Sequence, residues 1–562
     1  MPRNISLPRQ ISPPSQQRTE SWRNRISPNI WSRLSYSVLT TCCLGLAAES
    51  EAAIKRPDVE LKIGIVQRFG DEPTDKLNLQ ATPGDRLTFK FKTGERQQTL
   101  QASSAKLEVV MQTLPLPALA ERVVLSTHRS FETAENSAEQ WRKKGIEVEI
   151  AQPERWQVWA KREVYNTPLL RRLLLQSLQA KNNKTAYLDT QILQQVPQTS
   201  LVVNGYRYSR NELDIATNKN LIRVNQENER DAVLYAGSLR LQPNAYGDYT
   251  LVNNVPLETY LRGVVPHEIG SRAPYAAVEA QAIIARTYAL RNLRRFALDR
   301  YELCADTQCQ VYRGLNGTVA NTDQAIAATR GQVLTYQNEL VDALYSSTTG
   351  GVTAAFSDVW NGADRAYLQP VVDAGANIWN LSRRTLADEK NFQRFISLRQ
   401  GFNETGWGMF RWRKESSMEQ ITKDLQHYLQ VNKNPMANFK TIQQLQVVER
   451  SPSGRILKLA VQTNRGIFVL EKDEVRNAFS APRSTLFYLE PLNKGKNTLW
   501  GYAFVGGGLG HGVGLSQTGS QRLAQLGWSS SRILNFYYPS THIQPLSDKI
   551  TFWSQPLTAS QK

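Results

Sequence analysis

Apolar residues fill most positions between Ala276 and Leu290 and leave almost no polar face, and this pattern predicts a helix that is buried on all sides. Ser271 is a candidate cap, and Pro274 suits the first helical position. An arginine cluster at 291–295 follows, where the helix dipole favours cations. A buried helix that carries polar groups needs partners for them, and these groups are Gln281, Arg286 and Tyr288.

One carboxylate precedes this helix. We expect Val255–Ile269 to form a short apolar run and a turn that presents Glu268. Its neighbours Val264, Val265, Pro266 and Ile269 are apolar, and such surroundings favour the protonated form of a carboxyl group. Glu258 is the rival carboxylate, and we interpret it as a structural cap.

Period-two patterns and turn signals predict strands on the N-terminal side of this region. Residues 54–199 are predicted to be an α+β region that ends in a polar connector, Asn183–Thr199. Its expected strands are Leu61–Gln67, Arg86–Phe91, Arg122–Thr127, Ile146–Ile150 and Trp156–Ala160, and its expected helices are Glu132–Lys144, ended by Gly145, and Pro168–Asn182.

Strands also dominate residues 201–252 and return after the central helix. Gln332–Tyr336 and Leu340–Ser346 are predicted to form a hairpin around Gln337 and Asn338. Other expected elements are a helix at Ile421–Leu429, strands at Gln443–Glu449, Ile456–Gln462 and Ile467–Glu471, and a helix at Gln517–Leu526. A chain of 562 residues exceeds one ordinary core, so we predict a multi-domain α+β protein.

The net charge of the chain limits the kinds of molecule that we expect it to bind. The chain has 68 Lys and Arg against 50 Asp and Glu, a net charge of +18, which suits an anionic surface such as a cell wall or membrane. No zinc-finger, RNA-recognition or homeodomain signature accompanies this charge, so nucleic acid is not expected as a partner.

Residues 1–53 have the features of an export signal or N-terminal anchor, with an arginine-rich start and an apolar run at Leu34–Ala48. We therefore expect a protein that is exported to the periplasm or cell wall, and that contacts the membrane only if this segment stays uncleaved. In an oxidising compartment, Cys304 and Cys309 are expected to form a disulfide.

Four separated motifs resemble the SpoIID/LytB family, which comprises stage II sporulation protein D and the amidase enhancer LytB. They are Val255-Pro256-Leu257-Glu258 through Ala289-Leu290, Cys304 and Cys309 followed by Gln310 and Tyr312, Ser346 through Gly351, and Gly510-His511-Gly512 through Gly519 with Tyr537-Tyr538-Pro539-Ser540 behind it. The resemblance implies a catalytic domain at 200–545, followed by a C-terminal tail at 546–562. The β-α-β-β order at about 120–162 also resembles a SPOR domain, a small peptidoglycan-binding module; the alternative is an unrelated α+β packing domain.

For SpoIID-like members the resemblance implies a lytic transglycosylase, which cuts peptidoglycan between N-acetylmuramic acid and N-acetylglucosamine. One carboxyl group suffices as acid and then base, because the C6 hydroxyl of the substrate is the nucleophile. Glu268 takes this role. Alternatively, Glu268 is a structural carboxylate paired with Arg286 or Arg291, and the protein is a non-catalytic enhancer of a cell-wall amidase or a wall-binding scaffold.

Polar residues of the matching motifs are expected to line a groove for glycan strands, although each could instead be a buried, satisfied group. They are Arg286, Tyr288, Gln310, Tyr312, Ser346, Ser347, His511, Ser516 and Gln517. Some family members hold zinc with histidines beside the two cysteines. Here no histidine lies between His267 and His427, so we expect neither a metal nor another cofactor.

Overall fold

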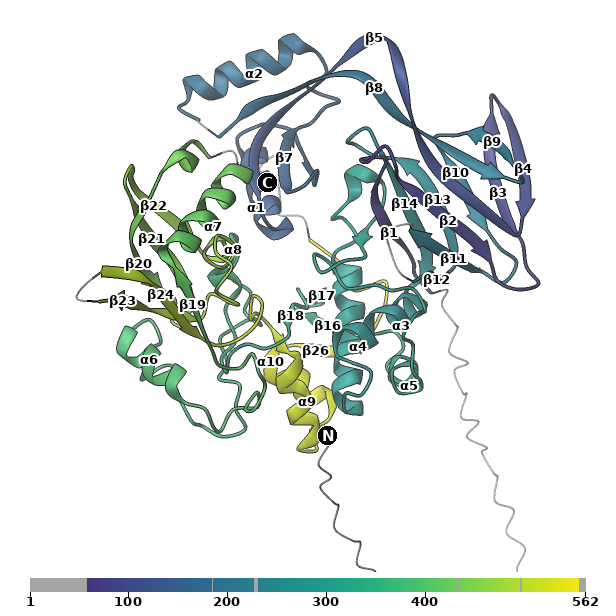
Figure 1. The fold of residues 1–562 in the computed structure, drawn as a ribbon. Helices are drawn as coiled ribbons and strands as arrows, with labels where there is room; N and C mark the ends of the chain where they lie inside the picture. Colours follow the sequence, from purple (N-terminus) through teal and green to yellow (C-terminus); the bar gives the residue numbers. More distant parts are fainter. Residues whose placement is uncertain (1–57, 184, 227–230, 433, 496–497, 555–562) are drawn as a thin grey trace, which may run out of the picture. The chain divides into compact units, whose positions relative to one another are not determined.

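The computed structural model describes residues 58–183, 185–226, 231–432, 434–495 and 498–554 (Figure 1). The predicted leader, residues 1–53, lies outside these ranges. Within them, no helix has both the length and the apolar character that a membrane crossing requires.

Two sheets share the first large core. The first has the order β15-β1-β14-β13-β10-β3-β4, and the second β12-β11-β2-β5-β7-β6, with β8 paired to β5 and β9 to β8. The predicted boundary at 199/200 falls inside β8, and strands from both sides of it pair in both sheets, so it does not separate two cores. The bounds are β1 Glu60–Phe69, β2 Lys76–Ala81, β3 Leu87–Thr93, β4 Arg96–Ala102, β5 Ser104–His128, β6 Val148–Ala151, β7 Trp156–Ala160, β8 Tyr187–Val203, β9 Tyr206–Ser209, β10 Leu213–Ala216, β11 Leu221–Gln226, β12 Val233–Ala236, β13 Ser238–Pro243, β14 Tyr249–Pro256 and β15 Leu303–Cys304.

A βαββαβ unit is built on the far halves of the long strands β5 and β8, which Figure 1 shows running side by side away from the other strands. Its helices are α1 (Phe131–Lys143) and α2 (Pro168–Ala180), and its strands have the antiparallel order β8-β5-β7-β6. This is the split-βαβ arrangement. The predicted strand-helix-strand-strand order is thus confirmed. The predicted polar connector at Asn183–Thr199 is wrong: β5 supplies the ladder for β8, most of whose residues before Thr199 are half-buried or exposed and need no apolar alternation.

Helix α4 (Tyr275–Arg291) is buried along nearly its whole length, which confirms the prediction from its apolar pattern. It packs against α3 (Leu257–Glu268), α5 (Ala320–Ala328), α9 (Gln517–Gln525) and α10 (Ser530–Tyr537), which surround it in Figure 1. The expected turn before α4 is wrong, because Leu257–Glu268 is helical and contains Pro266 in its last turn. Pro274 precedes the first helical residue instead of occupying it.

The remaining strands form smaller sheets. Those of β16, β17 and β26 and of β18 and β25 pack into the first core, whereas β19–β24 build a second one. The expected hairpin strand at Leu340–Ser346 is shorter than predicted: β17 ends at Leu340, and β18 pairs in parallel with β25. The bounds are η1 Ala297–Asp299, β16 Gln332–Tyr336, β17 Glu339–Leu340, β18 Tyr345–Ser346, η2 Phe356–Asp358, α6 Glu389–Ser397, β19 Trp412–Ser417, α7 Met418–Val431, η3 Pro435–Asn438, β20 Ile442–Arg450, β21 Ile456–Thr463, β22 Gly466–Glu471, α8 Asp473–Asn477, β23 Phe487–Lys494, β24 Thr498–Gly506, β25 Leu515–Ser516 and β26 His542–Pro545.

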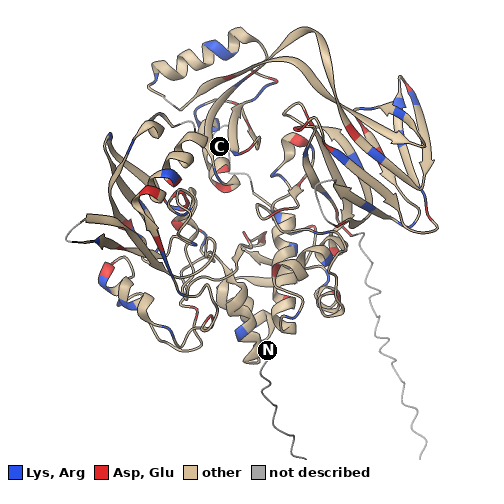
Figure 2. Ribbon diagram, in the orientation of Figure 1, with Lys and Arg blue, Asp and Glu red and all other residues tan. Residues whose placement is uncertain are grey.

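The α+β, multi-element architecture confirms the predicted fold class. Figure 2 shows basic and acidic positions interspersed along most of the described elements. In the part of the chain that the structure describes, the basic residues therefore do not gather on one helix or strand in the manner of a nucleic-acid-reading element.

Candidate active site

Glu268 is the last residue of α3, and its side chain is half-buried beside residues that come from distant parts of the chain. Its Oε1 accepts a hydrogen bond from the backbone N–H of Val311 at 2.8 Å. Its Oε2 accepts one from Nε2 of Gln517 at 3.3 Å. The hydroxyl of Tyr345 also contacts the carboxyl group. No arginine or lysine forms an ion pair with Glu268 among the described residues.

This setting favours a proton on Glu268. Burial raises the pKa of Glu268, and the hydrogen bonds that its carboxylate accepts from Val311 N–H and from Gln517 offset only part of the rise. The sequence predicted this effect from apolar neighbours, and the structure shows that Val264, Val265 and Pro266 are indeed buried while His267 is exposed.

The contacts of Tyr345 leave its oxygen able to accept that proton. Tyr345 donates its only hydroxyl proton to Oε1 of Gln310 at 3.1 Å. The orientation of the Gln310 amide is fixed because its Nε2 donates to the carbonyl of Ala285, which can only accept, and to Tyr260. A protonated Glu268 can therefore donate to Tyr345 without breaking this network.

The arginines that could have neutralised Glu268 have other partners. Arg286 is fully buried and binds both carboxylate oxygens of Glu258 at 2.7 Å. Arg291 pairs with Glu339 and Asp342. The structure thus places the predicted site residue Arg286 in a buried ion pair apart from Glu268, and it gives Glu258 the structural role that the sequence assigned to it.

Gln517 reaches Glu268 because two loops are joined in register. Ser346 pairs with Ser516 in the parallel strands β18 and β25. Ser516 caps α9 through its Oγ, which accepts from Gly519 N–H at 3.0 Å, so the next residue, Gln517, begins the helix beside Glu268. Ser346 lies buried, and its Oγ has no hydrogen-bond partner among the described residues.

A second, fully buried carboxylate holds these two loops together. Both oxygens of Glu404 accept hydrogen bonds: Oε1 from Thr349 N–H at 2.6 Å and from Ser516 Oγ at 2.5 Å, and Oε2 from the N–H groups of Gly350 at 2.8 Å and Gly351 at 2.9 Å. Glu404 thus fixes the start of α9, and with it the position from which Gln517 reaches Glu268.

The other predicted site residues lie around this centre in different roles. Tyr312 is buried and donates to Asn253 at 2.8 Å, and the hydroxyl of Tyr288 accepts from Arg295. Ser347 is half-buried, and its carbonyl accepts from Thr518 N–H at 3.1 Å. His511 packs its ring 5.0 Å from that of Trp360, and burial lowers its pKa to about 4, so the imidazole is neutral at physiological pH.

Cys304 and Cys309 are joined in a disulfide. Its neighbour Gln310 belongs to the Tyr345 network, and Val311 supplies the N–H that binds Glu268. The disulfide therefore restrains the segment that provides two of the contacts around Glu268.

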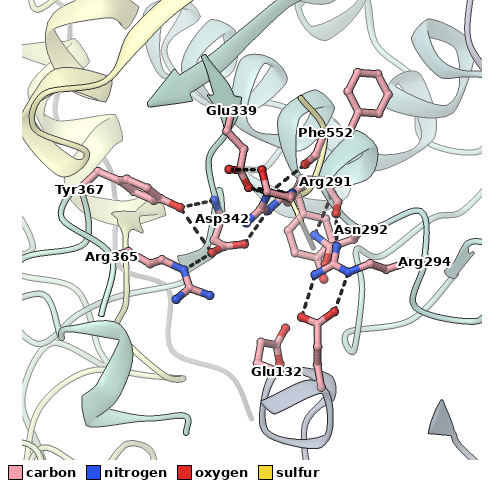
Figure 3. A network of polar contacts seen from close by, with 12 residues as sticks. Glu132, Arg291, Asn292, Arg294, Glu339, Asp342, Arg365, Tyr367 and Phe552 are labelled. Carbon is pink, nitrogen blue, oxygen red and sulfur yellow. Dashed lines mark hydrogen bonds and ion pairs between the residues drawn. The ribbon is translucent and has the colours of Figure 1, made fainter. Parts of the chain in front are cut away.

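A cavity of about 1320 Å³ lies elsewhere, between α1, the end of α4 and residues 336–367. Figure 3 shows its polar network, in which Arg291 and Arg365 converge on Asp342. Burial alone raises the pKa of Asp342, but these two arginines lower it to about 2. Arg294 in turn pairs with Glu135 of α1. These charges are already paired, so the network serves to join elements rather than to carry out chemistry.

Sequence reasoning missed three contributors to the site: Tyr345, the N–H of Val311 and Glu404. Tyr345 directly precedes the matching Ser346 loop, and Val311 lies between the matching Gln310 and Tyr312. Their positions beside motif residues were the only signal in the sequence that could have identified them. Glu404 lies in a region of mixed helix and loop that carried no motif. Gln281 is buried, and neither of its amide atoms bonds a described residue.

Comparisons with known proteins match two parts of the chain. Residues 245–336 match a family model described as stage II sporulation protein (SpoIID), and residues 354–514 match a domain of unknown function (DUF8618). The first match contains Glu258, Glu268, Arg286 and Gln310. The second contains Glu404.

Three curated relatives are similar to parts of the chain. An amidase enhancer of Bacillus subtilis (strain 168) is 28% identical over 300 residues, which are 50% of this chain and 40% of that protein. A stage II sporulation protein D of Bacillus amyloliquefaciens is 25% identical over 310 residues, 52% of this chain and 75% of that protein. A stage II sporulation protein D of Bacillus subtilis is 34% identical over 127 residues, 20% and 37% of the two chains. The similarity thus spans less than half of the amidase enhancer's length.

Proposed function

We propose that this chain, a member of the SpoIID/LytB family, is a peptidoglycan lytic transglycosylase that uses Glu268 as its single acid and base. The family membership supports a peptidoglycan-related role. The finer assignment, cleavage between N-acetylmuramic acid and N-acetylglucosamine, rests on the environment of Glu268.

The observation that carries the proposal is a half-buried carboxyl group whose pKa is raised by burial and which forms no ion pair with an arginine or lysine among the described residues. A structural carboxylate in this chain looks different: Glu258 is held by Arg286 on both oxygens. The two groups that donate hydrogen bonds to Glu268 in the described part of the chain are a backbone N–H and an amide, and neither is a second carboxyl group. A hydrolase that activates water generally places two carboxyl groups on either side of the bond, whereas a lytic reaction needs one.

In this reaction the protonated Glu268 donates its proton to the glycosidic oxygen as the bond from that oxygen to C1 of N-acetylmuramic acid breaks. The resulting carboxylate then takes the proton of the C6 hydroxyl of the same sugar, whose oxygen closes on C1. An anhydro-muramic end forms, no water is consumed, and Glu268 regains its proton. The protonated form can donate to Tyr345, whose own proton goes to Gln310, while Val311 N–H and Gln517 stabilise the charged form.

The similarity to a protein named amidase enhancer favours a second candidate, a non-catalytic protein that stimulates a separate cell-wall amidase. A wall-binding scaffold is the third. All three place the protein outside the cytoplasmic membrane, in contact with peptidoglycan and, in the second case, with an amidase.

Mass spectrometry of purified glycan strands after incubation with the protein separates these candidates. The lytic reaction predicts new anhydro-muramic ends in the absence of any other enzyme. Intact strands, together with faster release of stem peptides when a cell-wall amidase is added, support the enhancer and reject the lytic reaction. Intact strands without stimulation support the scaffold.

A further inference from the structure

Trp407 is the one exposed tryptophan in the described part of the chain, with 53% of its surface accessible to solvent. Tryptophan has the largest side chain to shield from water, and its exposure therefore calls for an explanation that an exposed leucine does not. The neighbouring aromatic residues Phe410 and Trp412 are buried. They show that aromatic side chains of this segment can be accommodated inside the protein.

The backbone around Trp407 is fixed although its side chain is exposed. Trp407 N–H donates to the carbonyl of Glu404 at 3.1 Å, and Phe410 N–H donates to the carbonyl of Trp407 at 2.9 Å. Glycines flank it on both sides, and a Cβ atom on Gly406 or Gly408 would meet nothing within 4 Å. The turn thus holds a large ring on a defined backbone and keeps neighbouring side chains away from it.

The same turn is built onto the loops that form the site. Met409 accepts a hydrogen bond from Gly508 of the glycine-rich stretch at 2.9 Å. The first residue of the turn, Glu404, binds Ser516 at 2.5 Å, and the residue after Ser516 contacts Glu268. Trp407 thus lies three residues after Glu404, and Glu404 binds Ser516, the residue that precedes the hydrogen-bond partner of Glu268.

We propose that Trp407 is a carbohydrate-stacking subsite, which binds the pyranose ring of an amino sugar in the strand whose scissile bond lies at Glu268. The identity of the ligand rests on the proposed function. A polymeric glycan extends on both sides of the bond that is cut, so subsites away from Glu268 are required to hold it. The C–H groups on one face of a pyranose ring are apolar, and an indole is the side chain best suited to cover them while its N–H remains available for a hydroxyl group.

The inference is tested by the affinity for purified glycan strands, measured in a Glu268→Gln background so that the strands stay intact. Trp407→Ala is compared with Trp407→Phe, which keeps an aromatic face, and with Tyr206→Ala, which removes an aromatic residue that is 69% exposed on β9. We expect Trp407→Ala to weaken binding at least about fivefold, as for an aromatic anchor at an interface. Trp407→Phe should retain most of the affinity, and Tyr206→Ala should retain all of it.

In the protein with Glu268 intact, Trp407→Ala should raise KM for strand cleavage more than it lowers kcat. Equal affinity of Trp407→Ala and its parent for glycan strands overturns the subsite and leaves the role of Glu268 untouched. Conversely, the protein with Glu268 intact could cut no strands while Trp407→Ala still weakens strand binding. That result rejects the proposed reaction and supports the subsite.

Discussion

Gln517 donates a hydrogen bond from Nε2 to Oε2 of Glu268 at 3.3 Å, although the two residues are 249 positions apart in the sequence. The contact joins the end of α3 to the beginning of α9. It stabilises the charged form of Glu268, and it opposes the burial that favours the protonated form.

Replacing Gln517 with Ala is expected to raise the pKa of Glu268, because a donor to the carboxylate is lost. A general acid works only while it is protonated, so activity falls as pH rises through its pKa. The alkaline limb of the cleavage profile should therefore move to higher pH. Gln521→Ala is the matched control, since Gln521 lies on the same helix and bonds the carbonyl of Ile269. An alkaline limb that stays in place in Gln517→Ala, or moves to lower pH, contradicts the assignment.

The ion pair between Arg286 and Glu258 is expected to stabilise the fold without taking part in the reaction. Arg286→Met leaves Glu258 buried without its cation and should lower the free energy of unfolding by roughly 3–5 kcal/mol. Chemical denaturation measures this loss. Arg272→Met, at an exposed position, should change it by no more than about 0.5 kcal/mol. Cleavage per folded molecule should be unchanged in both variants, and a large loss of kcat in folded Arg286→Met would assign Arg286 to the chemistry instead.

Asp373 is expected to reduce stability as pH rises. It is fully buried, it accepts from Asn403 and Tyr537 at 2.8 Å each, and burial together with the nearby Glu404 raises its pKa well above the usual value. A raised folded-state pKa gives a contribution that is complete below the unfolded-state pKa of about 4 and is lost as pH rises towards the folded-state pKa.

Asp373→Asn keeps the acceptor oxygen and removes the titrating proton, so its melting temperature relative to wild type should increase as pH is raised from 4 to 8. Asp388→Asn provides a control at an exposed helix cap, where this trend is not expected. A difference between Asp373→Asn and wild type that is independent of pH contradicts the titration of Asp373.

The sequence predicted those parts of the fold in which one residue type dominates a local pattern. The apolar run at Ala276–Leu290 could only be a buried helix, and Gly145, at φ 78°, ends α1 where a left-handed residue was expected. The prediction failed where a distant partner decides the structure. Strand β8 has little apolar alternation and is ordered by β5, and α3 is helical despite Pro266 because Leu257, Leu261 and Val264 pack into the common core.

The site followed the same division. The sequence singles out Glu268 because it closely follows the apolar run Val264–Pro266 in a recognisable motif, and the structure shows its burial while its catalytic role stays a prediction. The sequence could not predict that Arg286 pairs with Glu258 and not with Glu268, because this depends on which of the two glutamates in α3 faces α4. The role of Glu404 could not be predicted either. Its five hydrogen-bond donors come from the loop at 349–351 and from Ser516, which contact it only in the folded chain.

The most direct test of the central claim is the rate at which Glu268→Gln cuts purified glycan strands, measured beside its melting temperature and its affinity for the strands. The glutamine keeps the shape of the side chain and its contact with Val311 N–H, but it has no titrating proton. We expect cleavage to fall by roughly 10²–10⁴-fold, the range typical of general acid–base groups, while folding and binding persist. A stable Glu268→Gln protein that forms anhydro-muramic ends at the wild-type rate would contradict the assignment of Glu268 as the acid and base.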